Sequence, residues 1–175
     1  MDQTPDLIER FERSLRNSLP DTLETIWLRR ARTKQVEPAV DYDKWVIRSG
    51  RGWGKTRTGA EWVRKKALAY PGCRIAIVAR TYSDARDVCI EGESGLEQVV
   101  PAGLVRNGKW NRSLGEFIFV NGTRVKIFTA EKPDQLRGPQ HHFAWCDELA
   151  SWDYPEAWDQ LMFGLRLGAH PKVVV

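Results

Sequence analysis

The feature that most constrains this chain is a glycine-rich stretch between an expected strand and an expected helix. Residues 44–48 are typical of a short buried strand, residues 49–56 read SGRGWGKT, and residues 56–69 place apolar side chains at helical spacing. Residues 74–79 are an almost continuous apolar run, which predicts a parallel strand buried on both faces. This order of elements predicts an α/β fold with a mainly parallel sheet flanked by helices.

The glycine-rich stretch nearly matches the phosphate-binding pattern GxxxxGK[ST]. Glycines allow backbone N–H groups to turn around phosphate oxygens, and the positive end of the next helix faces the same anion. We expect Lys55 to reach the β- and γ-phosphates of ATP and Thr56 to place its hydroxyl on Mg²⁺. A turn that binds nothing is the alternative. The predicted nucleotide-binding residues are Ser49, where the pattern has glycine, Gly50, Arg51, Gly52, Trp53, Gly54, Lys55 and Thr56.

A second apolar segment, residues 143–146, ends at two adjacent acids. Asp147 is predicted to hold Mg²⁺, directly or through water, and Glu148 to polarise the attacking water as general base. A strand followed by an acidic helix cap is the alternative interpretation. Negative charge on the γ-phosphoryl group must also be offset in the transition state, and an arginine is the expected side chain for this. Arg51 could act in cis, and Arg137 could act in cis or on a neighbouring subunit; both could equally be surface arginines.

The remaining pattern completes the expected fold. Residues 117–120 and 123–128, joined by Asn121-Gly122, predict an antiparallel hairpin with a type I′ turn beside the parallel sheet. Further expected elements are helices over residues 6–19 and 153–167, a helix capped by Asp21, another capped by Ser83, and a strand from residue 171.

Composition excludes several classes of protein. Hydrophobic residues make up 42% of the chain, enough for a buried core. No apolar stretch reaches the ~18 residues of a membrane span, and the first residues lack the apolar region of a secretory signal, so we expect no membrane association. The three cysteines form no CxxC pair, which favours reduced thiols in a cytoplasm over a zinc site.

Two segments resemble the large terminase subunit of tailed phages, in its N-terminal ATPase domain. Residues 50–63, GRGWGKTRTGAEWV, look like that family's GRGxGKTRxGAEWV, and residues 136–138 followed by residues 146–152, CDELASW, look like its LRG…DELAxW. The resemblance runs from about Gln35 to Val175. It implies a P-loop NTPase fold of the additional-strand, catalytic-glutamate type, with the strand from residue 171 between the phosphate-loop strand and the acidic strand.

The resemblance also implies function. It implies an ATPase in a ring of identical copies that drives double-stranded DNA into procapsids, with the portal protein and the small terminase subunit as partners, in the host cytoplasm during phage assembly. Gln35 resembles the family's adenine-contacting glutamine. Arg51 matches the arginine inside its phosphate loop, and Arg137 matches an arginine that can act in trans.

By the same resemblance, residues 1–40 are an N-terminal helical segment leading to an adenine-side loop, and residues 41–175 are the ATPase core, incomplete at its C-terminus. The family continues into a coupling motif and a nuclease, so we expect no nuclease activity and a weak or uncoupled ATPase. Two alternatives stay open. A helicase-like ATPase would need a second RecA-like domain, and a decayed fragment would bind nucleotide, or serve as an assembly surface, without turnover.

Overall fold

The computed structural model describes residues 22–175, which fall within two units, Met1–Glu37 and Pro38–Val175. The helix expected over residues 6–19 lies outside the described residues. In the first unit, helix α2 (Leu23–Arg30) is followed by the 3₁₀ turn η1 (Thr33–Gln35). Thr22 caps α2, because its hydroxyl accepts a hydrogen bond from the amide of Thr25 at 3.1 Å. The cap therefore lies one residue after the expected Asp21.

The second unit is built on a six-stranded sheet of order β1-β6-β5-β2-β4-β3. All neighbouring strands are parallel except β3 and β4, so the prediction of a mainly parallel sheet with an antiparallel pair is confirmed. Strand β6 lies between β1 and β5, the position that the fold resemblance implies. The strands are β1 (Lys44–Trp45), β2 (Arg74–Ala79), β3 (Glu116–Ile118), β4 (Arg124–Thr129), β5 (Phe143–Cys146) and β6 (Lys172–Val174).

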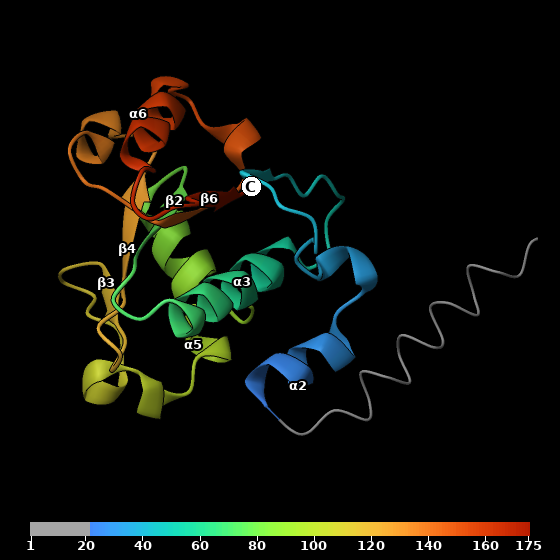
Figure 1. Cartoon of the computed structure of the whole chain (residues 1–175). Coiled ribbons are helices and arrows are strands. Elements are labelled where there is room, and N and C mark those ends of the chain that lie inside the picture. Colours follow the sequence, from blue (N-terminus) through green and yellow to red (C-terminus); the bar gives the residue numbers. More distant parts are fainter. Residues whose placement is uncertain (1–21) are drawn as a thin grey trace, which may run out of the picture. The chain divides into compact units, whose positions relative to one another are not determined.

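Helices cover both faces of this sheet. Along β2, Ile75 and Ile77 face the cluster that contains α3 (Lys55–Ala69), whereas Ala76 and Val78 face the cluster that contains α6 (Glu156–Gly164). Figure 1 shows α3 and α6 on opposite sides of the strands. The shorter helices are α4 (Tyr82–Asp84), the π-helix η2 (Ala85–Ile90), α5 (Leu96–Val99), and the 3₁₀ turns η3 (Ala102–Leu104), η4 (Arg106–Gly108), η5 (Pro133–Leu136) and η6 (Leu149–Ser151).

The hairpin connection differs from the expected type I′ turn. A type I′ turn needs a positive φ at both Asn121 and Gly122. Only Gly122 has one, +87°, whereas the φ of Asn121 is not positive. The amide of Phe119 donates to the carbonyl of Thr123 at 2.9 Å, which leaves a three-residue loop. The side chain of Asn121 instead accepts a hydrogen bond from the Thr123 amide at 3.0 Å, and this local bond replaces the left-handed conformation.

Two predicted helix starts are also wrong. The helix after β2 is capped by Thr81, not Ser83, because the Thr81 hydroxyl and the Asp84 backbone and carboxylate form a reciprocal capping box. Helix α6 begins at Glu156, with Pro155 in the capping position, so it is shorter than the expected 153–167. Residues 22–175 form no helix with both the length and the apolar character needed to cross a membrane. All three cysteines are buried and free.

Candidate functional site

The glycine-rich loop joins β1 to the first turn of α3. Gly52 and Gly54 have φ angles of +74° and +89°, which favour glycine over residues with a Cβ. Gly54 is the N-cap of α3, and its carbonyl accepts a hydrogen bond from the Thr58 hydroxyl at 2.9 Å. Lys55 is the first residue of this 15-residue helix, and its ammonium donates to the Ser49 carbonyl at 3.4 Å. The loop therefore presents Lys55 at the positive end of a helix dipole.

The loop lines a hollow of about 440 Å³. The opposite wall is formed mainly by the segment that follows β2, with Asp87, Glu93 and Ser94, and Glu148 also reaches this space. On the loop side the lining residues are Gly50, Arg51, Gly52, Trp53, Gly54, Lys55 and Thr56. All predicted phosphate-binding residues except Ser49 thus surround one space.

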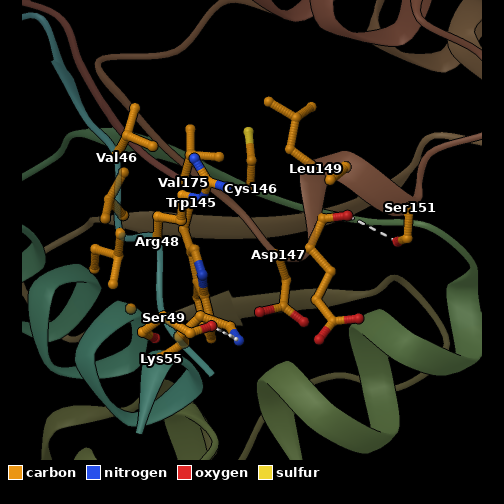
Figure 2. A pocket seen from close by; sticks show the side chains of 15 residues that line it. Val46, Arg48, Ser49, Lys55, Trp145, Cys146, Asp147, Leu149, Ser151 and Val175 are labelled. Carbon is orange, nitrogen blue, oxygen red and sulfur yellow. Dashed lines mark hydrogen bonds between the residues drawn. The ribbon is translucent and has the colours of Figure 1, made fainter. Parts of the chain in front are cut away.

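A second cavity of about 610 Å³ lies beyond the carboxyl ends of β1, β6 and β5. Its lining includes Ser49, Lys55, Asp147 and Glu148 among mostly apolar residues. Figure 2 shows Lys55 and Asp147 on facing sides of this cavity, one from α3 and the other from the end of β5. Lys55 and Glu148 line both spaces, whereas Thr56 lines only the hollow and Asp147 only the cavity.

The surroundings of the Asp147 carboxyl shift its pKa. Burial, together with the neighbouring carboxylates Glu148 and Asp84, raises its pKa to about 6, and the Lys55 ammonium opposes this rise. The Cys89 thiol also opposes the rise in the pKa of this carboxyl. A divalent cation would stabilise the ionised form, because it would offset the negative charges of Asp147, Glu148 and Asp84.

The chemical types of the oxygen donors suit Mg²⁺, although Thr56 and Asp147 line different spaces. A carboxylate and a hydroxyl, those of Asp147 and Thr56, are ligand types that Mg²⁺ accepts, with phosphate oxygens and water completing its coordination. Within residues 22–175 no group of three or more His, Cys, Asp or Glu side chains could hold a metal ion by itself. A metal at this place would therefore need the phosphates of a bound nucleotide as further ligands.

The remaining predicted site residues are not all brought together. Arg51 is exposed and lines the hollow, whereas Arg137, exposed after η5, lines neither the hollow nor the cavity. Gln35 belongs to the first unit, where its Oε1 accepts hydrogen bonds from the backbone amide and the Nε of Arg32 at 3.0 and 3.3 Å. The structure therefore assigns Gln35 a local partner within its own unit.

Sequence reasoning missed two residues near the acids. Arg48 lines the larger cavity, and the π-helix places Cys89 against Asp147. Arg48 could have been found, because it directly precedes the glycine-rich loop at the end of the expected strand. Cys89 had no such signal, because an interrupted helix leaves no fixed spacing in the sequence.

Solved structures share this fold. The ATPase domain of the large terminase of Thermus phage P74-26 is 19% identical with a TM-score of 0.57, over 92% of this chain and 66% of that chain. The large terminase of bacteriophage HK97 is 17% identical with a TM-score of 0.64, over 90% of this chain and 33% of that chain. This chain therefore spans less than two thirds of each of those proteins. At such identities the likeness shows the P-loop NTPase fold alone.

The family is shown by sequence. No match is found among curated proteins. A family model described as "Terminase large subunit, T4likevirus-type, N-terminal" matches residues 46–175, from the end of β1 to the last residue of the chain. That span includes the glycine-rich loop and the Asp147–Glu148 pair. Because the match covers most of the chain, this protein belongs to the family of terminase large subunits and aligns with the N-terminal part of that subunit.

Proposed function

We propose that this chain hydrolyses ATP to drive double-stranded DNA into procapsids, as the ATPase part of a packaging motor. The observation that carries the proposal is that Lys55, Asp147 and Glu148 line one cavity directly beside the glycine-rich loop. A cationic side chain at a helix N-terminus, opposite two carboxylates at the end of a buried strand, is the arrangement that phosphoryl transfer needs. Membership of the large terminase family supports the link to DNA packaging.

Each side chain has a defined part in the proposed reaction. The backbone N–H groups of residues 50–56 and the Lys55 ammonium bind the phosphates and orient the γ-phosphoryl group. Thr56 and Asp147 would hold Mg²⁺, which would offset negative charge on the phosphate oxygens. Glu148 accepts a proton from the attacking water. Arg51 stabilises charge from within the same subunit, and Arg137 does so on a neighbouring one.

The proposed partners follow from the same role. They are double-stranded DNA, further copies of this chain in a ring, the portal protein and the small terminase subunit, in the host cytoplasm during phage assembly. Gln35 is proposed to contact the adenine ring. The proposal includes no nuclease activity for this chain.

The decisive test is phosphate release from Mg·ATP, with and without linear double-stranded DNA, by the native chain and by Glu148→Gln. We expect the variant to lose turnover by roughly 10²–10⁴-fold, because it lacks only the proton acceptor. It should bind a fluorescent ATP analogue as tightly as the native chain. Identical traces for both proteins would favour a nucleotide-binding or assembly fragment without turnover and would overturn the proposal.

A further inference from the structure

The backbone at the acid pair is held in an uncommon conformation. Glu148 has φ +46° and ψ +48°, in the left-handed region. Among residues 22–175 only Asn107 is a second non-glycine residue with positive φ. Asparagine tolerates this region through its short polar side chain, whereas glutamate has no such advantage. Such a conformation persists only where surrounding contacts impose it, so the contacts of this turn carry information about function.

Two side chains just downstream hold the carbonyls of both acids. The Ser151 hydroxyl and the Ser151 amide both donate to the Glu148 carbonyl, at 2.7 and 2.8 Å, and Figure 2 shows the hydroxyl bond. The indole Nε1 of Trp152 donates to the Asp147 carbonyl at 3.1 Å. On the upstream side, the amide of Asp147 donates to the Val78 carbonyl of β2 at 2.8 Å. The turn is therefore fixed on both sides.

We propose that Ser151 and Trp152 are positioning residues, which hold the Asp147–Glu148 turn so that both carboxylates face the cavity shared with Lys55. This inference rests on the proposed ATPase function and deepens it. Ser151 also lines this cavity, whereas Trp152 does not. Each bonds only to a backbone carbonyl, and thereby fixes the backbone from which a carboxylate extends.

The packing of Trp152 is separable from its hydrogen bond. Trp152 is 9% exposed and packs in the cluster that contains Ala157 and Leu161 of α6. Trp158, on α6, packs against the same cluster. Trp152→Phe removes the indole N–H and keeps an aromatic ring in place. Trp158→Phe makes the same exchange in the same cluster, at a residue outside the acid turn, and is the matched control.

The test compares Ser151→Ala, Trp152→Phe, their double variant and Trp158→Phe in the full chain. We expect kcat for phosphate release to fall by roughly 10–100-fold in the double variant, because a small displacement of a catalytic group is enough for such a loss. The Kd for a fluorescent ATP analogue should stay within about twofold, since the phosphate loop is untouched. Ser151→Thr should restore most of the turnover lost in Ser151→Ala. An unchanged kcat in the double variant, or an equal loss in Trp158→Phe, would overturn the proposal.

A second measurement separates this inference from the proposed function. Amide hydrogen exchange of residues 147–151, followed by mass spectrometry, reports how firmly the turn is held whether or not the chain hydrolyses ATP. Faster exchange confined to these residues in the double variant would support the positioning role even if the native chain showed no turnover. Unchanged exchange in the double variant would overturn it, whatever the ATPase assay gives.

Discussion

Lys55 and Asp147 face each other across one cavity, although 91 positions separate them in the sequence. The parallel sheet explains this proximity. The carboxyl ends of β1 and β5 lie at the same edge, with β6 between them, and the glycine-rich loop and the acid pair both follow such ends. The charge of Lys55 opposes the rise in the pKa of Asp147.

Replacing Lys55 by alanine should therefore weaken nucleotide binding. A lost hydrogen bond from a charged donor is worth roughly 1.5–3 kcal/mol, which corresponds to a Kd about 10–100-fold higher. Titration of the full chain with a fluorescent ATP analogue in Mg²⁺ measures the effect. Lys132→Ala, at a residue exposed before η5, is the control and should bind as the native chain does. Equal affinities for Lys55→Ala and the native chain would contradict the phosphate-binding role.

The left-handed backbone at Glu148 should affect how far different substitutions there change the stability of the fold. Glu148→Ala and Glu148→Gly both remove the carboxylate, but only glycine adopts this conformation without strain. We expect the glycine variant to be more stable than the alanine variant by roughly 1 kcal/mol, and both to lack turnover. Urea unfolding midpoints of the two variants measure the difference. An alanine variant of equal or greater stability would show that the turn relaxes to another conformation.

Some elements of the fold can be predicted from the sequence and others cannot, depending on the kind of sequence pattern that specifies them. Helix α3 and strands β2, β5 and β6 could be predicted, because long apolar runs and a glycine-rich loop restrict the chain to few conformations. The strand order followed from the family resemblance and not from the residues themselves. Glu148's conformation could not be predicted, because the bonds that impose it come from Ser151 and Trp152 only after the turn has formed.

The failures share a physical cause, which is competition between local hydrogen bonds. Thr81 and Ser83 are both hydroxyl residues that can cap a helix, and the capping box with Asp84 decides for Thr81. A similar competition decides the hairpin connection. The Asn121 side chain accepts a hydrogen bond from the Thr123 amide, although the Asn121-Gly122 dipeptide favours a type I′ turn. The competing caps and turns differ in free energy by about 1 kcal/mol, and the spacing of residues in the sequence does not show which of them is favoured.

A close contact between α3 and β5 gives a prediction on packing. A Cβ added to Gly59 would overlap the Trp145 indole, and Trp145 lines the larger cavity. Gly59→Ala should therefore destabilise the fold by roughly 1–3 kcal/mol through overpacking. Gly103→Ala, where no atom lies within 4 Å of the added Cβ, should stay within about 0.5 kcal/mol of the native chain. Thermal unfolding of both variants measures the contrast, and equal melting temperatures would contradict it.

His141 should make the fold sensitive to acid. Its ring is buried beside Phe128, and burial, with the nearby charges of Arg74 and His142, lowers its pKa to about 4. The unfolded chain, with a histidine pKa near ~6.5, binds this proton more readily than the folded chain. Stability is therefore lost as the pH falls from about 6.5 towards 4, by roughly 3 kcal/mol from this residue.

The measurement is the unfolding free energy of the native chain and of His141→Gln between these pH values. The variant should show a flatter decline. Asp147 acts in the opposite direction, because its raised pKa lets the folded chain hold a proton there, but this contribution is common to both proteins and cancels in their difference. His170→Gln, at an exposed position, should leave the decline unchanged. Parallel curves for His141→Gln and the native chain would contradict the assignment.

The position of Arg137 gives a test of assembly. Because this exposed side chain lines neither the hollow nor the cavity, we expect it to serve the site of a neighbouring copy. Arg137→Ala and Glu148→Gln should each abolish phosphate release, for different reasons. Mixed together, they should regain turnover, because a site with an intact Glu148 then meets a neighbour with an intact Arg137. Arg51 lines the hollow of its own subunit, so Arg51→Ala mixed with Glu148→Gln should stay inactive, because every site then lacks either its own Arg51 or its own Glu148. If the mixture of Arg137→Ala and Glu148→Gln stays inactive at all ratios while each variant still binds nucleotide, Arg137 acts within its own subunit or not at all.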